Sequence, residues 1–397
     1  MLGFSSIGSH QIGGILLILD LEGRSERKLE VIAEKPVDSE RSFEARATYI
    51  FVKPLTYRII VYDRNKNVIG QVMDFRKLTF GKRLNNFGTA EFDLSTNYPI
   101  ASDLIDLRKN YIEIYRDYNQ DRDLVWAGEQ AVRRSLLNNK GNNWSEIICY
   151  SWFEQLKQRY TEEFERYELE NASDIVATLI ATTQGKTGGN LGITYGVLDD
   201  TYLADIIYQN DNIADAILGL SDGGLDFEIT DKKVLNVSSI LGQDETDNVV
   251  LEYGYNITDM TIVEDFSQPV NQSLVLGEVL GEDTLQRVER TNTTHRTSYG
   301  LRQGRMNQLE PAILAIFEDK GDASIRKFGV PLIKVDFSLV GNNTPSINNF
   351  GVGDGIRLIV KDGIYNIDEE YRVFEWQLTV DKQNAEKLSL VLGKFTI

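Results

Sequence analysis

The chain of 397 residues carries 60 acidic and 42 basic residues, which gives a formal charge of −18, and 42% of its residues are hydrophobic. This length supports two or more domains with substantial cores, and the hydrophobic content excludes an intrinsically disordered chain. The acidic balance argues against binding to a nucleic-acid backbone as the main role, because phosphate contacts need a basic surface.

The first part of the chain is predicted to form an N-terminal extension (1–54). Residues 1–14 are rich in glycine and serine and have no hydrophobic periodicity, so we expect an extended arm that orders only against a partner. The short apolar runs 15–20 and 29–33 flank a charged turn and predict a β-hairpin. A further short strand is expected at 49–52.

Residues 55–153 are predicted to form a β-barrel domain. Short strand-like segments recur here, separated by turns rich in Asp, Asn and Gly, a spacing typical of a small barrel or sandwich. In residues 88–94, Ala90, Phe92 and Leu94 alternate with polar residues and are expected to face the core. The other expected strands are 57–62, 68–84 (one strand or a pair), 111–115, 124–127, 131–137 and 146–152.

Residues 154–247 are predicted to form an α+β insert. Asn171 and Asn212 each precede an apolar helical stripe, and a short polar side chain at that position caps free backbone donors. The first stripe consists of Ile175, Val176, Leu179 and Ile180. The other expected elements are a helix-compatible segment at 153–169 and a β-hairpin formed by 225–229 and 234–237.

Residues 248–397 are predicted to form a second β-barrel domain that includes a short helix at 309–317. Near the end of the chain, apolar residues alternate with polar ones and predict strands with one buried face. These apolar residues are Phe374, Trp376, Leu378 and Val380 in one strand and Leu388, Leu390 and Leu392 in the next. The other expected strands are 249–253, 260–266, 272–276, 333–339 and 356–360.

Membrane and secretion signals are missing from the sequence. The longest apolar run is far shorter than the roughly 20 residues of a transmembrane helix, and the N-terminus lacks the basic start of a signal peptide. Cys149 is the only cysteine, so it cannot form an intrachain disulfide, and we expect it to be a small core residue. These features predict a protein without a membrane span that is made in a cytoplasm.

Residues 184–189 (QGKTGG) contain the GKT of a phosphate-binding loop. The segment follows a predicted helix, whereas the motif precedes its helix, and Ile180 stands where the first glycine is required. The end of a helix followed by a loop is the favoured interpretation.

Asp117, Asn119, Asp121 and Asp123 have the spacing that begins a calcium loop. Arg122 replaces the central glycine of such a loop, and its twelfth position is occupied by a glycine instead of a glutamate. Strand signals flank the segment, so a hairpin turn is favoured over a metal site.

The remaining candidates for chemistry are scattered. His10 and His295 are the only histidines and have no cysteine partner for a zinc site. A Ser–His–acid triad around His295 stays open, although no nucleophile-elbow sequence supports it. A glycosidase needs two carboxylates at a set distance, which sequence alone does not show, so Glu162–Glu163 and Glu369–Glu370 are interpreted as solvated residues.

Five arginines lie in one polar stretch: Arg287, Arg290, Arg296, Arg302 and Arg305. They lack the interleaved aromatic residues of a platform for single-stranded nucleic acid. Inter-subunit salt bridges or a solvated hairpin are the favoured interpretations. We predict no catalytic, cofactor-binding or metal-binding residue in this chain.

Three groups of residues resemble the baseplate hub, or tail-associated, proteins of bacteriophage tails. They are LNNFGTAEFDL (84–94) with YIEIYRD (111–117) and WAG (126–128); the helix pair near 171–222 with LDFEI (225–229); and FGVGD (350–354) with the final strands to Gly393. The resemblance covers residues 55–397 and leaves the extension 1–54 outside it.

The resemblance implies a mainly β fold with an α+β insert, two related β-barrel domains as in phage tail hub proteins, and an N-terminal extension. It implies a structural hub protein of the virion tail tip, assembled in the host cytoplasm as a homotrimeric ring. In that ring, three chains with two barrels each adapt a six-fold tail tube to a three-fold tip.

The implied partners are distal tail or tail-tube ring proteins, the tape-measure protein, and central fibre or tip proteins, with DNA only in transit. No cofactor and no catalytic activity are expected. A tail-associated glycan hydrolase and a receptor- or carbohydrate-binding tail protein stay open as alternatives.

A set of aromatic residues in the first barrel is expected to form a half-exposed surface that a neighbouring subunit covers. Its members are Tyr57, Tyr111, Tyr115, Trp126, Tyr150 and Trp152.

Overall fold

The computed structural model describes residues 9–12, 15–19, 27–33, 44–49, 56–98, 101–118, 121–137, 143–267, 269–279, 285–308, 313–329, 332–339 and 346–394. The chain divides into two compact units. One consists of Met1–Thr56 with Asp117–Arg122, and the other of Tyr57–Arg116 with Asp123–Ile397.

The first unit contains a four-stranded antiparallel sheet in the order β1-β2-β3-β4. Strands β2 (Ile15–Leu19) and β3 (Arg27–Ala33) form the predicted hairpin. Strand β4 spans Glu44–Tyr49, and residues 50–52 of the strand predicted there lie outside the described residues. Strand β1 (Ser9–Ile12) pairs with β2, so this part of the expected arm has a strand neighbour within the chain.

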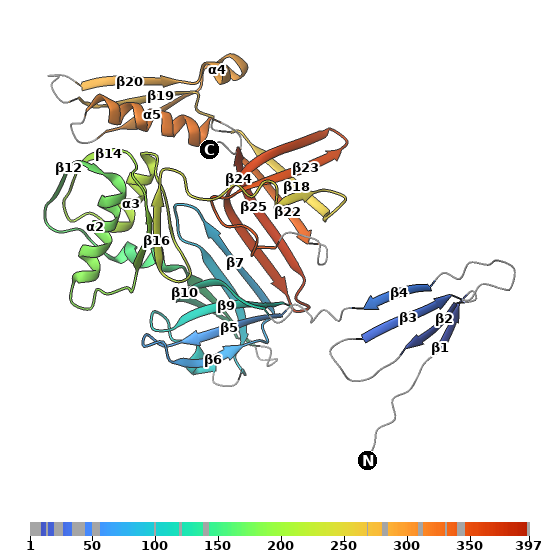
Figure 1. The fold of residues 1–397 in the computed structure, drawn as a ribbon. Coiled ribbons are helices and arrows are strands. Elements are labelled where there is room, and N and C mark those ends of the chain that lie inside the picture. Colours follow the sequence, from blue (N-terminus) through green and yellow to red (C-terminus); the bar gives the residue numbers. More distant parts are fainter. Residues whose placement is uncertain are drawn as a thin grey trace. The chain divides into compact units, whose positions relative to one another are not determined.

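Most strands of the second unit belong to one 13-stranded sheet (Figure 1). Its first half is made of β5 (Thr56–Tyr62), β6 (Val68–Val72), β7 (Lys77–Arg83), β8 (Thr89–Ser95), β9 (Tyr111–Tyr118), β10 (Asp121–Leu136) and β11 (Trp144–Tyr150). Its second half is made of β17 (Val250–Glu252), β18 (Ile257–Asp265), β22 (Leu332–Leu339), β23 (Gly355–Asp362), β24 (Tyr365–Asp381) and β25 (Glu386–Lys394).

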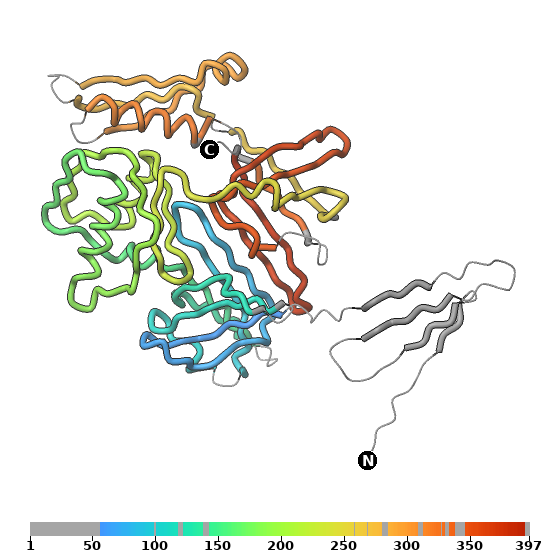
Figure 2. The backbone as a smooth tube through the Cα atoms, in the orientation of Figure 1, coloured from blue at the N-terminus to red at the C-terminus, as the bar shows by residue number. Residues whose placement is uncertain are grey.

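Strand β24 joins the two halves of this sheet. Its first part pairs with β23, its last part pairs antiparallel with β7, and β25 lies along its other edge. Figure 2 shows the early strand β7 running beside the red C-terminal strands. The backbones approach closely at Gly81, where a Cβ atom would lie 2.3 Å from the carbonyl oxygen of Trp376. A glycine at this position therefore permits the seam between β7 and β24.

The predicted mainly β fold with an α+β insert is confirmed. The two predicted barrels are not independent, however, because the β7–β24 pairing makes them parts of one sheet. Strand pairings among the described residues run along an open path from β18 to β6, with β23 and β17 as a branch from β24, and close neither barrel.

The alternation predicted for the barrel strands is largely confirmed. Ala90, Phe92 and Leu94 are buried, as are the three leucines of β25. In β24, Trp376, Leu378 and Val380 face the core, but Phe374 is only half-buried because a β-bulge interrupts the pairing between Val373 and Glu375. Another bulge lies in β10, which is one long strand where the sequence predicts two.

The predicted insert contains two helices, α2 (Ala172–Gly185) and α3 (Ile213–Asp222). The side chains of Asn171 and Asn212 cap them, as predicted, by accepting hydrogen bonds from backbone N–H groups at the start of each helix. The predicted stripe of α2 is fully buried. Small sheets complete the insert: β12 (Glu165–Asn171) with β14 (Leu203–Tyr208), and β13 (Thr194–Leu198) with β16 (Val234–Ser238) and β15 (Asp226–Ile229).

The helix suggested for residues 153–169 is wrong. The segment begins as a short 3-10 helix, η1 (Trp152–Gln158), and continues into strand β12. Glu165 lies opposite Tyr208 of β14, and Tyr167 is buried against the Tyr208 ring. Pairing with β14 therefore outweighs the helical preference of the charged residues.

A small α/β module lies between the neighbouring strands β18 and β22. Its sheet has the order β20-β19-β21, and helix α5 packs on one face through Val275, Ile316 and Phe317. Its elements are β19 (Gln272–Glu278), β20 (Leu285–Thr291), α4 (Thr293–Tyr299), β21 (Gln303–Asn307) and α5 (Leu314–Phe328). The helix predicted at 309–317 therefore starts later and is longer; residues 309–312 are outside the described chain.

Candidate functional site

The described part of the chain holds no group of three or more His, Cys, Asp or Glu side chains arranged to bind a metal ion. Cys149 is fully buried, as predicted, and burial raises the pKa of its thiol well above the usual range, so it is an inert core residue. No helix within the described ranges is both long and apolar enough to cross a membrane.

The segment QGKTGG follows a helix, as predicted, because α2 ends at Gly185. The side-chain amide of Gln184 bonds to both the N–H and the carbonyl of Ile193, at 2.8 and 3.0 Å. Lys186 Nζ lies 3.0 Å from a carboxylate oxygen of Glu162 and 2.9 Å from the carbonyl oxygen of Tyr160. These contacts fasten a loop and leave no phosphate cradle.

The segment that begins like a calcium loop connects strands β9 and β10, as predicted for a hairpin turn. Residues 119–120 lie outside the described residues. Arg122 Nε lies 3.7 Å from Asp117 Oδ1, so a cation of the chain itself is close to this carboxylate.

His295 lies in the short helix α4, with its ring centroid 6.0 Å from that of Tyr299. Its Nδ1 is buried and has no hydrogen-bond partner within the described parts of the chain, so neither a serine nor a carboxylate there orients it for catalysis. The side chain of His10 belongs to the residues that the structure does not describe.

The five arginines of the polar stretch 287–305 divide into different roles. Arg290 pairs with Asp322 at 2.8 Å and with Glu318 at 3.4 Å, which ties β20 to α5. Arg287 pairs with Glu289 two residues along the same strand. The other three arginines of this stretch are exposed and have no ion-pair partner among the described residues: Arg296, Arg302 and Arg305.

A buried ion pair links the insert to the last barrel strands. Arg372 of β24 donates from Nη2 to Asp226 Oδ2 of β15 at 2.5 Å, and from Nε to the Gly353 carbonyl at 2.9 Å. The other oxygen of Asp226 accepts a 2.8 Å hydrogen bond from Asn85, just after β7. Both charged side chains are only about a tenth exposed, at 11% and 10%. One carboxylate thus connects the insert to both halves of the sheet.

The β15–β16 turn of the insert docks on the first barrel. Asp231 accepts hydrogen bonds from Lys82 Nζ at 2.5 Å and from the Ala127 N–H at 3.0 Å. Its carbonyl oxygen accepts a 3.0 Å hydrogen bond from Trp152 Nε1. The Lys233 ammonium lies 4.1 Å from the Trp152 ring centroid, in the range of a cation–π contact.

A third buried contact connects strands β9 and β25, which belong to different halves of the main sheet. Arg116 of β9 donates from Nε to Glu386 of β25 at 2.9 Å, and the Tyr57 hydroxyl donates to the same carboxylate. The two charged side chains are 10% and 7% exposed. Together with burial, the Glu386 charge raises the pKa of Tyr57 well above its usual range, so this phenol stays a donor.

These contacts correct the expected aromatic surface of the first barrel. Tyr57, Trp126 and Trp152 are buried within the chain, at 1%, 0% and 4% exposure. Trp126 donates to the Gly81 carbonyl oxygen, and the other two bond to Glu386 and Asp231. Residues of the same chain therefore cover these three rings, whereas Tyr111, Tyr115 and Tyr150 are half-buried, as expected.

The lowered pKa of Lys233 should make the stability of the chain depend on pH. Burial, together with the positive charge of Lys66, lowers the pKa of its ammonium to about 8. A free lysine has a pKa of about 10.4. Between these values the unfolded chain binds more protons than the folded one, so the free energy of unfolding should rise with pH in that window. The free energy of unfolding of the native chain, minus that of Lys233→Met, should rise by on the order of 1–2 kcal/mol between about pH 7.5 and pH 10. Urea unfolding at each pH measures this; a constant or falling difference contradicts it.

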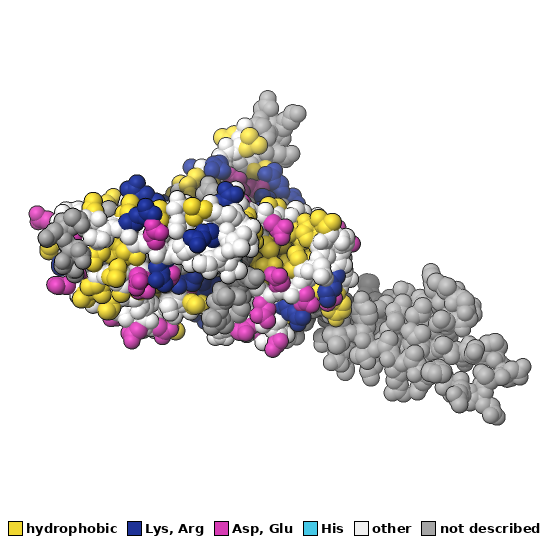
Figure 3. All heavy atoms as spheres, turned by 90° about the horizontal axis from the view of Figure 1, so that it is seen from above, with side chains coloured by type: hydrophobic (Ala, Val, Ile, Leu, Met, Phe, Trp, Pro, Cys, Tyr) yellow, Lys and Arg dark blue, Asp and Glu magenta, His cyan; other side chains and the backbone are white. Residues whose placement is uncertain are grey.

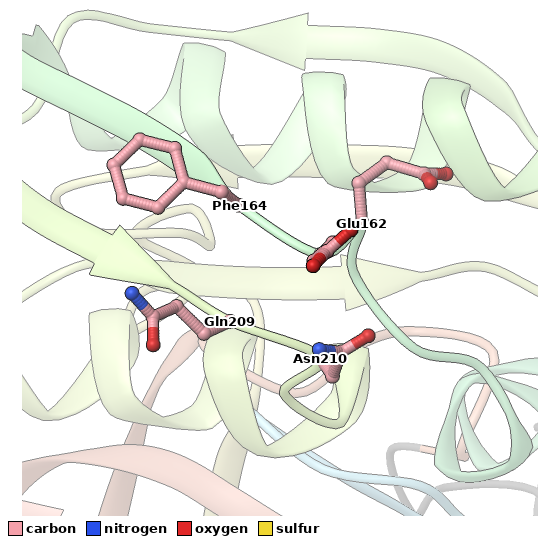
Figure 4. Close-up of a pocket in the computed structure, with 5 residues that line it drawn as sticks. Glu162, Phe164, Gln209 and Asn210 are labelled. Atoms are coloured by element: carbon pink, nitrogen blue, oxygen red, sulfur yellow. The ribbon is translucent and has the colours of Figure 1, made fainter.

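A surface hollow with a volume of about 680 Å³ lies at one end of the β12–β14 sheet. Glu162, Glu163, Phe164, Gln209 and Asn210 line it. Figure 4 shows Phe164 and Gln209 projecting to the same side, with Glu162 pointing away from them. The pair Glu162–Glu163 is exposed, as predicted, and so is Glu369–Glu370 of β24.

Solved structures of tail proteins share the arrangement of most of this chain. A tail protein from Neisseria meningitidis MC58 matches with a TM-score of 0.61 and 13% identity, covering 85% of this chain and 96% of that one. The 43 kDa tail protein of prophage MuSo2 from Shewanella oneidensis matches with a TM-score of 0.60 and 12% identity, covering 85% and 98%. The chain has the fold of phage tail proteins.

The tail-protein fold extends to secretion machinery. An Escherichia coli component of the type VI secretion system, described as structurally similar to the T4 bacteriophage tail proteins gp27 and gp5, matches with a TM-score of 0.52 and 9% identity over 85% of this chain and 77% of its own length. No protein-family model and no curated protein matches the sequence. At such identities the similarity establishes the fold, and function has to be argued separately.

Within this tail-protein fold, Asp226 and Glu386 form ion pairs inside the protein. The ion pairs of Asp226 and Glu386 and the docked turn at Asp231 hold the insert and the two halves of the sheet together. Sequence reasoning missed these contacts because their partners are far apart along the chain. Chemically, these ion pairs hold the subdomains in place.

Proposed function

We propose that this chain is a structural component of a phage-type tail, placed at the hub of the tail tip. The observation that supports this most strongly is the extent of the fold match: it covers nearly the whole of two solved tail proteins and 85% of this chain. A match of that extent includes the insert together with the strands on both sides of it. The proposal rests on analogy of fold.

The proposed assembly is a homotrimeric ring. Each chain supplies two barrel-like halves, so three chains present six similar units around a central channel and join a six-fold tube to a three-fold tip. The shared strand β24 supports this proposal, because a continuous sheet keeps the spacing of the two halves fixed.

The proposed neighbours are a distal tail or tail-tube ring above the hub and central fibre or tip proteins below it. The channel would pass the tape-measure protein and then DNA, in a virion assembled in the host cytoplasm. The formal charge of −18 is consistent with DNA only in transit, because an acidic wall repels phosphates.

We further propose that the chain has no catalytic activity of its own. In the described parts, the carboxylates with the most specific contacts, Asp226 and Glu386, are held by arginines inside the protein, and His295 lacks an orienting partner. Sugar-release and cell-wall turbidity assays should both be blank. Activity lost on substitution of one acidic residue would favour the alternative of a tail-associated glycan hydrolase.

The unpaired arginines of the module identify a candidate seam between subunits. Arg305 lies on the outer face of the β20-β19-β21 sheet, opposite the face covered by α5, since it is paired in register with Leu274 and not with Val275. Figure 3 looks onto the molecule from the side of β20 in Figure 1 and shows basic side chains interspersed with apolar and acidic ones. An acidic second copy offers carboxylates to such a face.

The test is the oligomeric state. We expect a trimer by native mass spectrometry, alone or with the neighbouring tail proteins, with interfaces larger than about 1,000 Å². The double variant Arg302→Glu/Arg305→Glu should weaken the trimer at least tenfold, and the weakening should diminish at high salt. Arg133→Glu, the same kind of charge change at an exposed arginine of β10, is the control. A two-fold dimer, or a chain that stays monomeric in the assembled tip, contradicts the hub proposal.

A further inference from the structure

Two loops at the end of the β12–β14 sheet form the walls of the hollow in Figure 4. One precedes β12 and carries Glu162, Glu163 and Phe164. The other follows β14 and carries Gln209 and Asn210. The hollow is wide and polar, so it does not suit a compact apolar ligand, which needs an enclosed pocket.

Hydrogen bonds between the two loops hold the hollow in shape. The Asn210 N–H donates to the Glu162 carbonyl at 3.0 Å, and the Thr161 N–H donates to the Asp211 carbonyl at 2.9 Å. The Thr161 hydroxyl accepts from the Asp211 N–H at 2.9 Å. Within the first loop, the Glu162 N–H donates to the Glu165 carboxylate at 2.7 Å. A ligand would therefore meet walls that are already ordered, which lowers the entropic cost of binding.

The side chains facing this hollow include groups that the fold leaves unused. Phe164 is 59% exposed, and no other aromatic ring in the described chain packs on it. The side chains of Glu163, Gln209 and Asn210 have no hydrogen-bond partner among the described residues. Glu162 differs, because Lys186 already pairs with it at 3.0 Å. An exposed ring and the free amide of Gln209 therefore project to the same side, and the free side chains of Glu163 and Asn210 also line the hollow.

We propose that this hollow binds a neutral saccharide. The C–H face of a pyranose packs on an aromatic ring, and its hydroxyls both donate and accept hydrogen bonds. A side-chain amide does both as well, and a carboxylate accepts. Figure 4 shows the Gln209 amide projecting to the same side as the Phe164 ring.

Other ligand classes fit the same residues less well. Anionic sugars and phosphates would be repelled by Glu163. A basic peptide would find a free negative charge only at Glu163 among the lining residues, because Lys186 already pairs with Glu162. Its ammonium groups only donate hydrogen bonds, so the N–H donors of the two amides would stay unused. The proposal concerns binding only and does not depend on the tail-hub role.

The test uses the full chain and saturation-transfer difference NMR, with maltotriose, lactose and N,N′,N″-triacetylchitotriose as separate probes at millimolar concentration. We expect saturable transfer to the ring protons of at least one probe. Phe164→Ala should weaken the affinity for that probe at least tenfold, and Gln209→Ala should weaken it less. Tyr255→Ala removes another exposed aromatic residue, 72% exposed and outside the hollow, and should bind like the native chain. Circular dichroism checks that each variant is folded.

Two outcomes overturn the proposal. One is transfer that is absent for all three probes, or that is unaffected by Phe164→Ala. The other is displacement of the bound sugar by trilysine at equal concentration, which would identify the hollow as a site for basic peptide side chains. Either result leaves the oligomer test of the hub proposal untouched, so the two proposals fail separately.

Discussion

Replacing Asp226 with alanine should lower the free energy of unfolding by about 3–5 kcal/mol. The substitution leaves the Arg372 guanidinium, 11% exposed, without its counter-charge. It also removes the acceptors of the Leu241 N–H and the Asn85 amide. A buried charge that loses its partner costs more than the pair contributes, because desolvation of the remaining ion is no longer compensated. Urea unfolding followed by circular dichroism measures the loss.

Two further variants show whether burial is the cause. Asp93→Ala breaks the ion pair with Arg76, whose side chain is 52% exposed, and should cost about 1 kcal/mol or less. Asp226→Ala combined with Arg372→Met removes both charges and should recover part of the loss of the single variant. If Asp226→Ala costs no more than Asp93→Ala, the ion pair does not hold the insert against the sheet.

The helices and strands whose signals are local could be predicted from the sequence. Asn171 and Asn212 cap their helices through backbone groups two or three residues away. Ala90, Phe92 and Leu94 alternate along a single strand, and such alternation needs no knowledge of the partner strand. In both cases the physical cause and its effect lie within one segment.

The contacts that connect the subdomains could not be predicted in this way. Asp226 and Arg372 are 146 positions apart, and Arg116 and Glu386 are 270 apart. In a chain with 60 acidic residues, nothing local distinguishes the few carboxylates that become buried. The same limit explains the error at 153–169, where pairing with β14 decides the structure, and the expectation that Tyr57 and Trp152 would be exposed.

The hollow of Figure 4 lies between these cases. The pair Glu162–Glu163 is visible in the sequence as two adjacent carboxylates, but Gln209 and Asn210 join it only when β12 pairs with β14. The local signal that the sequence offers is an aromatic residue directly after two adjacent carboxylates, at Glu162–Phe164.

The seam between β7 and β24 leaves no room for a side chain at Gly81. Gly81→Ala should destabilise the chain by about 3 kcal/mol or more, because the new Cβ would lie 2.3 Å from the Trp376 carbonyl oxygen and 3.0 Å from Gln377 Cα. Backbone atoms of a paired strand cannot move aside as a flexible side chain does. The Gly81 carbonyl also accepts the hydrogen bond from the buried Trp126 indole, so a shift of β7 would disturb the first barrel as well.

Gly219→Ala is the matched control, since it makes the same chemical change in the interior of α3, where a Cβ meets nothing within 4 Å. Alanine is favoured over glycine in a helix, so this variant should gain up to about 1 kcal/mol. Thermal unfolding followed by tryptophan fluorescence suits both variants, because Trp126 and Trp376 lie next to the seam. If Gly81→Ala is as stable as the native chain, β7 and β24 do not pair as described, and the two halves are separate sheets whose spacing is free to vary. The six-unit ring would then lose the support of a continuous sheet, and the ion pairs of Asp226 and Glu386 would be left to connect the two halves of each chain.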